Sequence, residues 1–232
     1  MPEFTKPFTR DGVLGVIRSK AWYGLDPTTG AFNWQMSVNN IGQELGLDPS
    51  SVNSAIARAF TPNCLSRVSI TNKPLLASLQ DIGVHPHAWT VGDEDWQRTK
   101  FVNSGAIKYV DDAHYHSVEL NKIKELRKIV DSLITQNVRT IVVADDKESN
   151  IVDVKQLALE YRNRSVLIMD YLMKLSNPLA DATAFYVWFK QLMHDRSNEQ
   201  IGLILDYDGV IADTDGVLFG PAVDNLWGLF NR

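Results

Sequence analysis

The chain has 232 residues, 44% of them hydrophobic and 22% charged, which fits an ordinary soluble globular protein with one large domain, or with a core and a smaller appendage. The formal net charge of −5 argues against a nucleic-acid coat protein and against a protein that binds anionic membranes, although it does not exclude a local basic cleft. Cys64 is the only cysteine, which excludes intramolecular disulfides and cysteine zinc clusters and favours a reducing, cytoplasmic location. We expect no transmembrane helix, because no run of about 18 apolar residues occurs, and no secretory signal, because residues 1–6 lack an apolar core.

The first 72 residues are rich in turn residues and carry two predicted helices, over 34–45 and 51–60. From about residue 75 onward, helical segments alternate with short apolar runs, which is typical of a doubly wound α/β protein with a Rossmann-like parallel sheet. The predicted helices there cover 75–82, 96–104, 122–134, 152–162, 182–194 and 221–230, and the predicted strands cover 85–91, 140–144, 166–169 and the apolar run that ends at Asp206.

The most informative motif follows the last predicted strand. Apolar residues 203–205 lead into Asp206, and Asp208, a glycine and the pair Asp213-Thr214 follow. Side chains at i and i+2 of an extended strand point to the same face, so Asp206 and Asp208 are expected to share one small site. Two carboxylates so close repel each other unless a cation lies between them or one keeps its proton. A solvated turn would also contain Asp and Gly, but the apolar lead-in favours a site for chemistry.

A second acidic cluster, Asp145-Asp146, follows the predicted strand over 140–144. Because the ends of parallel strands gather at one edge of a sheet, this cluster is expected to face Asp206 across the crevice. Oxygen ligands from two strand ends would suit Mg²⁺, which binds few protein carboxylates. Asp146 has a competing interpretation as a cap of the following helix.

A third strand end carries Thr90 and Val91 before a glycine turn. The Thr90 hydroxyl and the backbone N–H groups of this turn would suit a phosphoryl group at the start of a helix. The same residues are also typical of the start of an ordinary helix, so this motif alone is weak evidence for a phosphoryl site.

Together these segments resemble the haloacid dehalogenase-like (HAD) superfamily of phosphotransferases over most of residues 75–232. The first motif of that family, an apolar strand followed by Asp-x-Asp-Gly-x-x-x-Asp-Thr, matches 206–214 at every defined position. The second motif, a strand that ends in Thr or Ser, is similar to Thr90, and the fourth, an acidic cluster after an apolar strand, is similar to Asp145-Asp146. The third motif, a lysine four residues before a helix leucine, resembles Lys122, and Lys124 is the alternative candidate.

The order of the motifs departs from the family, whose members carry the Asp-x-Asp strand first. Here that strand comes last, so the chain resembles a circular permutant with both termini in the cap, the insertion that normally follows the first motif. The resemblance implies a HAD-like α/β core over 73–214 and a small helical cap formed by 1–72 and 215–232. The segment 176–200 is long enough to link the last two strands, so this order is physically permissible.

The resemblance implies a Mg²⁺-dependent phosphatase or phosphotransferase that acts on a small phosphorylated metabolite through an aspartyl-phosphate intermediate. Asp206 would be the nucleophile and Asp208 the general acid and base, and this second aspartate favours phosphate transfer over dehalogenation. The other residues implied are Asp206, Asp145, Asp146 and the backbone carbonyl of Asp208 for the metal, and Thr90, Val91 and Lys122 for the phosphoryl oxygens. Two features depart from the family: Asn150 stands where many members have another acid, and the usual proline after the motif lysine is absent.

An alternative hypothesis is a non-enzymatic binding or regulatory protein of the same fold that contacts DNA through residues 34–60. Residues 41–58 resemble a helix-turn-helix, but Arg58 is the only cation near the expected recognition helix. Proteins that read DNA usually carry several phosphate-contacting Lys or Arg residues. A helical hairpin of the cap is therefore favoured, and nucleic acid is not the expected partner.

Two pairs of histidines, His85 with His87 and His114 with His116, raise the question of a second metal site. The first pair is expected at a strand start and the second in a loop. Neither spacing matches a zinc signature, so polar loop histidines are the favoured interpretation.

Overall fold

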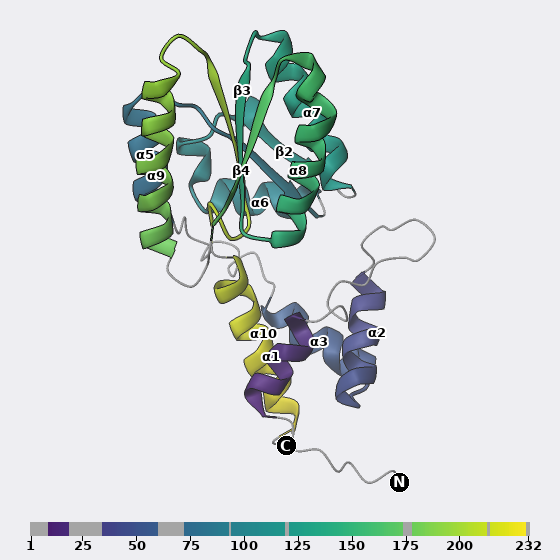
Figure 1. Cartoon of the computed structure of the whole chain (residues 1–232). Coiled ribbons are helices and arrows are strands. Elements are labelled where there is room, and N and C mark those ends of the chain that lie inside the picture. Colours follow the sequence, from purple (N-terminus) through teal and green to yellow (C-terminus); the bar gives the residue numbers. More distant parts are fainter. Residues whose placement is uncertain are drawn as a thin grey trace. The chain divides into compact units, whose positions relative to one another are not determined.

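The computed structural model describes residues 9–18, 34–59, 72–92, 94–118, 121–173, 178–212 and 214–230. The chain divides into two compact units: unit 1 comprises Met1–Val68 and Thr214–Arg232, and unit 2 comprises Ser69–Asp213 (Figure 1). The role of unit 1 as a cap stays a prediction. Phe60, at the end of a predicted helix, and Asp213, in the first motif, lie outside the described residues.

Unit 2 is built on a parallel sheet, which confirms the predicted α/β class. Among the described residues this sheet has five strands in the order β2-β1-β5-β3-β4, and every neighbouring pair is parallel. The central strand, β5, is the last of them in the sequence. Strand β3 is buried along its whole length, as expected for a parallel strand with helices on both faces. The strands are β1 (His87–Val91), β2 (Tyr115–Val118), β3 (Thr140–Asp145), β4 (Leu167–Leu172) and β5 (Ile201–Asp206).

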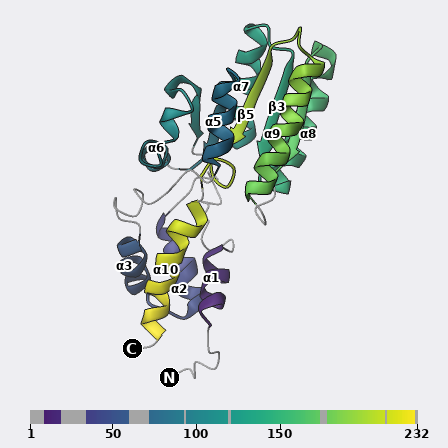
Figure 2. The ribbon, with the colours of Figure 1, turned by 90° about the vertical axis from the view of Figure 1, so that its left-hand side faces the viewer.

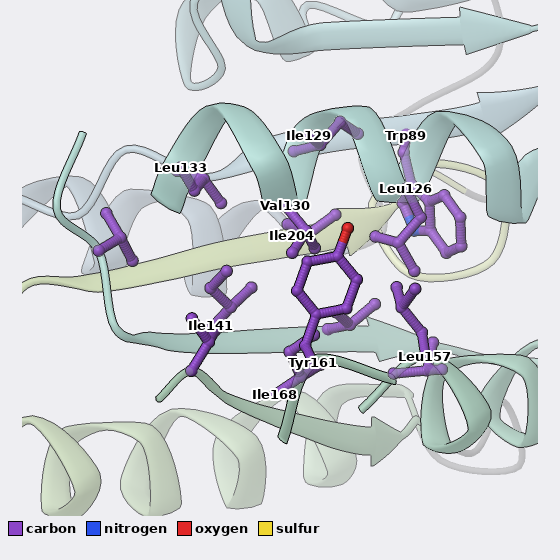
Figure 3. Packing of buried hydrophobic residues seen from close by; sticks show 14 residues of the cluster. Trp89, Leu126, Ile129, Val130, Leu133, Ile141, Leu157, Tyr161, Ile168 and Ile204 are labelled. Carbon is purple, nitrogen blue, oxygen red and sulfur yellow. The ribbon is translucent and has the colours of Figure 1, made fainter. Parts of the chain in front are cut away.

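Helices cover both faces of this sheet, α7 and α8 on one side and α5 and α9 on the other (Figures 1 and 2). The apolar face of α7 includes Leu126, Ile129 and Leu133, which pack with Ile141 of β3 and Ile204 of β5 (Figure 3). Full burial of such a side chain contributes about 2 kcal/mol to folding. The helices of unit 2 are α5 (Lys73–Asp81), α6 (Glu94–Asn103), α7 (Lys122–Thr135), α8 (Glu148–Tyr161) and α9 (Pro178–Asp195).

Strand β2 was not predicted. The prediction that His116 lies in a loop is wrong, because this residue belongs to β2. β2 is short and lacks an apolar run, but it pairs with β1 and sets His116 opposite Trp89. Nδ1 of the buried His87 lies 2.9 Å from Nε2 of His116, and the His87 ring stacks on His114 with centroids 4.1 Å apart. Burial is the main cause that lowers the pKa of His87 to about 3, and the neighbouring His114 and His116 lower it further. His87 and His116 are therefore packed strand residues rather than loop residues.

Unit 1 is a group of helices with a hydrophobic core of its own. Helix α1 (Arg10–Arg18), which was not predicted, packs with α2 (Trp34–Leu45), α3 (Pro49–Ala59) and α10 (Thr214–Phe230). Each helix contributes buried side chains to the core, among them Ile17, Ile41, Ile56 and Leu226. Helix α10 begins earlier than the predicted 221–230 and continues through Pro221. Across the described residues, no helix has both the length and the apolarity that a membrane crossing requires.

The turn between α2 and α3 has the form expected of a helical hairpin. Gly46 adopts a φ of 67°, which suits glycine, and a carboxylate oxygen of Asp48 accepts the backbone N–H of Ser51 at 3.1 Å, as an N-terminal cap does. Ser50, Asn53 and Arg58 are exposed on α3. The alternative hypothesis that this segment contacts DNA is not tested by these features.

Candidate active site

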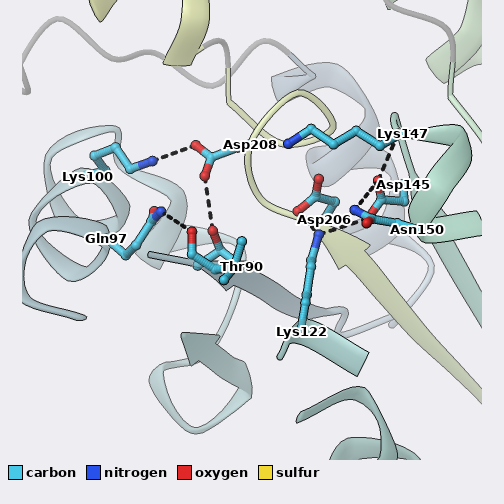
Figure 4. A network of polar contacts seen from close by, with 10 residues as sticks. Thr90, Gln97, Lys100, Lys122, Asp145, Lys147, Asn150, Asp206 and Asp208 are labelled. Atoms are coloured by element: carbon cyan, nitrogen blue, oxygen red, sulfur yellow. Dashed lines mark hydrogen bonds and ion pairs between the residues drawn. The ribbon is translucent and has the colours of Figure 1, made fainter. Parts of the chain in front are cut away.

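The carboxyl ends of three neighbouring strands bring the predicted residues to one edge of the sheet. Asp206 is the last residue of β5, which pairs with β1 on one side and with β3 on the other. Asp145 is the last residue of β3, and Thr90 is next to last in β1. Parallel strands place their carboxyl ends on the same edge, which is where open α/β sheets bind ligands. Figure 4 shows these side chains with their partners.

Strand alternation directs two carboxylates toward the start of α7. Val143 and Ile204 belong to the core under α7, so Asp145 and Asp206, two residues further along each strand, point to the same side. Lys122, the first residue of α7, reaches both: its Nζ lies 2.8 Å from Asp145 Oδ2 and 2.6 Å from Asp206 Oδ1. Lys124, the alternative candidate for the motif lysine, is exposed. The lysine that reaches the carboxylates is therefore Lys122.

The charges around Lys122 are buried and strongly coupled. Burial raises the pKa of Asp206 well above its ordinary value; Lys122 opposes this shift, and Asp145 and Asp208 add to it. Burial lowers the pKa of Lys122, but the carboxylates of Asp206 and Asp145 outweigh burial and the net shift is upward. The ammonium also lies 4.1 Å from the centroid of the Trp89 ring, a cation–π contact. Lys122 is thus held in its charged form between two acids.

Asp145 is fixed by donors on both of its oxygens. Oδ1 accepts the backbone N–H of Lys147 at 2.9 Å, and the Asn150 amide donates to Oδ1 at 3.0 Å and to Oδ2 at 2.9 Å. An amide group this close to two carboxylate oxygens must present its nitrogen, because its oxygen would be repelled. Asn150 therefore orients Asp145.

Asp146 completes a group of three acids. Ligand oxygens of Asp145, Asp146 and Asp206 lie within 4.8 Å of one another. Asp146 does not cap α8, since the N-cap position belongs to Lys147. Burial, partly offset by Lys147, raises the pKa of Asp146. Within the described part of the chain, buried Oδ1 of Asp146 and buried Oδ2 of Asp206 have no hydrogen-bond partner. Two unpartnered carboxylate oxygens in one cluster fit a hard divalent cation such as Mg²⁺.

Asp208 turns away from this acidic group and is held by different partners. Its Oδ1 lies 2.6 Å from Nζ of Lys100 on α6, and its Oδ2 accepts the hydroxyl of Thr90 at 3.0 Å. The two aspartates of the motif were expected to need a shared cation or a proton. In the structure each has a lysine as partner, Asp206 with Lys122 and Asp208 with Lys100, and the cation or proton stays a prediction.

Lys100 was missed because a lysine on a polar helix is normally exposed, whereas its side chain here is 2% exposed. The available signal was spacing: Gln97, Lys100 and Phe101 stand at i, i+3 and i+4, share one face of α6 and are all buried. The Gln97 amide donates to the backbone carbonyl of Val91 at 2.8 Å, which ties α6 to the end of β1. Phosphoryl binding by the backbone of Val91 stays a prediction.

The loop after β5 depends on Gly209. This residue has a φ of 94°, and a Cβ atom added to it would lie 2.5 Å from Oδ2 of Asp146. Its N–H donates to the carbonyl of Ala212 at 2.9 Å, and the N–H of Ala212 donates to the carbonyl of Tyr207 at 2.9 Å. Glycine is therefore required both by the turn and by the close approach of the Asp146 carboxylate.

In comparisons with known proteins, the chain matches no protein-family model. It also matches no curated protein and no solved structure. Any function must therefore be inferred from the residues and geometry of the site.

Proposed function

We propose that the protein is a Mg²⁺-dependent phosphatase or phosphotransferase of the HAD type that acts on a small phosphorylated metabolite. The observation that carries this proposal is Asp206 at the end of the central strand: one oxygen is bound to Lys122, and the other is buried and unpartnered. The strand order supports it as well. β5 is last in the sequence but lies between the strands that carry Thr90 and Asp145, as a circular permutation of that fold requires.

Asp206 is the proposed nucleophile. A carboxylate oxygen of Asp206 attacks phosphorus and forms a new bond, while the bond between phosphorus and the ester oxygen breaks. The product is an aspartyl-phosphate and an alcohol. In the second step, a water oxygen attacks phosphorus and the bond to Asp206 breaks, which releases inorganic phosphate. An alcohol in place of that water would make the reaction a phosphotransfer.

Asp208 is the proposed general acid and base. It gives a proton to the leaving ester oxygen in the first step and takes one from the attacking water in the second. Asp208 is bound to Thr90 and Asp206 to Lys122, so a phosphoryl group held by Thr90 and Lys122 would face both carboxylates. Asp208 is 24% exposed, which gives it access to water and to substrate.

Lys122 and Thr90 are the proposed phosphoryl ligands, together with the backbone of Val91. The Lys122 ammonium offsets the negative charge that gathers around Asp206 and Asp145 when a phosphate ester enters. Because it contacts both acids, Lys122 also fixes the direction of the Asp206 carboxylate.

The residues that would hold Mg²⁺ are Asp206, Asp145 and Asp146, with the backbone carbonyl of Asp208. Mg²⁺, when bound, would offset the charge of the carboxylates and the phosphoryl oxygens and favour the ionised form of Asp206. The two unpartnered oxygens of Asp206 and Asp146 support this assignment, and Asn150 holds Asp145 in place.

The proposal extends to unit 1 and to location. Unit 1 would serve as the cap that selects the substrate, built from residues near both chain ends. The single cysteine favours a reducing, cytoplasmic location.

The test is hydrolysis of p-nitrophenyl phosphate with and without Mg²⁺, comparing the wild-type protein with Asp206→Asn. We expect turnover that requires Mg²⁺ and is abolished by the substitution. Asp153→Asn is the matched control, because Asp153 is an exposed aspartate on α8 in the same unit. Turnover that persists in Asp206→Asn, or a wild-type protein that hydrolyses no phosphate ester at any pH, would contradict the proposal.

A further inference from the structure

We propose that Lys100 and Thr90 together form a binding site for a phosphoryl group, and that the Asp208 carboxylate fills this site until substrate displaces it. The inference deepens the proposed function and rests on it in one respect, namely that Asp208 is the acid and base of the reaction. The anion site itself does not depend on turnover.

The contacts of Asp208 are those of an anion in a binding site. One carboxylate oxygen lies 2.6 Å from the Lys100 ammonium, and the other accepts the Thr90 hydroxyl at 3.0 Å (Figure 4). A phosphoryl group presents oxygens that accept the same two donors, and charge-assisted hydrogen bonds of this kind are the strong ones. Thr90 was predicted from the sequence as a phosphoryl ligand, and its hydroxyl already donates to an anionic group, the Asp208 carboxylate.

The two donors are fixed, whereas the carboxylate has room to leave. Lys100 and Thr90 are each 2% exposed, whereas the Asp208 side chain is 24% exposed. Lys100 lies on a helix that Gln97 ties to the end of β1, and its ammonium is 5.5 Å from the Tyr207 ring centroid. Asp208, by contrast, lies in the loop after β5, where it forms a β-bridge with Ala212. A displacement of the Asp208 carboxylate would therefore move a side chain of this loop and leave both buried donors in place.

The charge of Lys100 makes the exchange of one anion for another favourable. A buried ammonium left without a partner is strongly destabilising, so Asp208 can leave only when another anion arrives. The phosphoryl group of a substrate supplies that anion. Binding of substrate would then free the Asp208 carboxyl for the leaving oxygen, and the acid would become available only when a phosphoryl group is present.

The test measures binding of inorganic phosphate by calorimetry at a fixed excess of Mg²⁺, in a background that lacks the internal carboxylate. In Asp208→Asn, Lys100 is available for phosphate. Adding Lys100→Met should weaken phosphate binding about tenfold or more, the loss expected for a charge-assisted hydrogen bond. Lys108→Met in the same background is the matched control and should leave the affinity unchanged, because Lys108 is exposed.

The outcomes separate this inference from the proposed function. The inference is overturned if Asp208→Asn binds phosphate equally well with and without Lys100→Met, because Lys100 would then only position Asp208. It is also overturned if Asp208→Asn does not bind phosphate. Hydrolysis of p-nitrophenyl phosphate by the wild-type protein is measured separately. Phosphate binding that depends on Lys100 without any turnover would support the anion site and contradict the proposed function.

Folding is controlled within the same set of variants. The double variant removes both members of the Lys100–Asp208 pair, which proteins tolerate better than the loss of one. Thermal unfolding with and without phosphate verifies that each variant is folded. If Asp208→Asn does not fold, Lys100→Gln in the wild-type protein replaces it, since the glutamine amide still donates to Asp208. Phosphate binding should again weaken, and an unchanged affinity would overturn the inference.

Discussion

Replacing Lys122 tests whether this lysine balances the buried acids of the site. Lys122→Met keeps the length of the side chain and removes the ammonium that contacts Asp206 at 2.6 Å and Asp145 at 2.8 Å. Breaking a buried ion pair from one side costs about 3–5 kcal/mol, because the remaining charge is uncompensated. We expect a loss of that size in the free energy of unfolding at pH 8, because the buried acids then lack the cation that balances them.

The loss should shrink on acidification, and its direction follows from linkage. Without the ammonium, the folded-state pKa of Asp206 is raised further above its unfolded value, because burial and the neighbouring acids already raise it and Lys122 opposes them. Stability contributed by a raised pKa is present at low pH and is lost as the pH rises through the folded-state value. Each pH unit between the two values is worth about 1.4 kcal/mol for one proton. The destabilisation is therefore expected to be clearly smaller at pH 5.5 than at pH 8.

Urea unfolding followed by tryptophan fluorescence measures this effect, since Trp89 lies against Lys122 and reports on the site. Lys124→Met is the matched control, because Lys124 is exposed on the same helix. A loss below about 1 kcal/mol, or one that is equal at the two pH values, would refute the reasoning. An equal loss in Lys124→Met would do the same.

Three further substitutions test other parts of the site and core. Gly209→Ala should lower the free energy of unfolding by about 2 kcal/mol or more, because the residue has a φ of 94° and its new Cβ would meet the Asp146 carboxylate; urea unfolding measures this. His87→Gln should flatten the pH dependence of stability. Because the pKa of His87 is lowered to about 3, the wild-type protein loses stability as the pH falls below about 6.5. The expected loss between pH 7 and pH 5 is about 2 kcal/mol. Asn150→Ala should weaken Mg²⁺ binding about 10- to 100-fold in a calorimetric titration, because Asp145 loses both amide contacts.

Each of these has its own control. Gly83→Ala is the control for Gly209→Ala, because Gly83 also has a positive φ but has nothing within 4 Å of an added Cβ. An equally large loss of unfolding free energy in Gly83→Ala would mean that the contact with the Asp146 carboxylate has no effect. His85→Gln replaces an exposed histidine and should keep the wild-type pH dependence; a curve for His87→Gln that also keeps it would contradict the assigned role of His87. Unchanged Mg²⁺ affinity in Asn150→Ala would show that Asn150 does not support a metal site.

The central strand and its carboxylates could be predicted from the sequence because they follow from a simple pattern. An apolar run that ends in Asp206 predicts a buried parallel strand, and the same pattern before Asp145 predicts its neighbour. The meeting of the two acids at one edge then follows from parallel pairing. Helix α7 was predicted from its apolar face, and Lys122 lies at its first residue.

Other parts could not be predicted because they depend on tertiary contacts. β2 has few apolar residues and becomes a strand through its pairing with β1. Lys100 is buried because it meets Asp208, a partner more than a hundred residues away in the sequence. The direction of Asp208, away from Asp206, depends on that lysine and on Thr90, so the spacing of the two aspartates did not reveal it.

The central claim is that Asp206 becomes covalently phosphorylated during turnover, and chemical trapping tests it most directly. The protein is quenched during hydrolysis of p-nitrophenyl phosphate with Mg²⁺ and treated with sodium borohydride, which reduces an acyl phosphate to an alcohol. Peptide mass spectrometry is then expected to find homoserine at position 206, and only in samples that received substrate. Turnover with an unmodified aspartate at position 206, or homoserine at another position, would contradict the account.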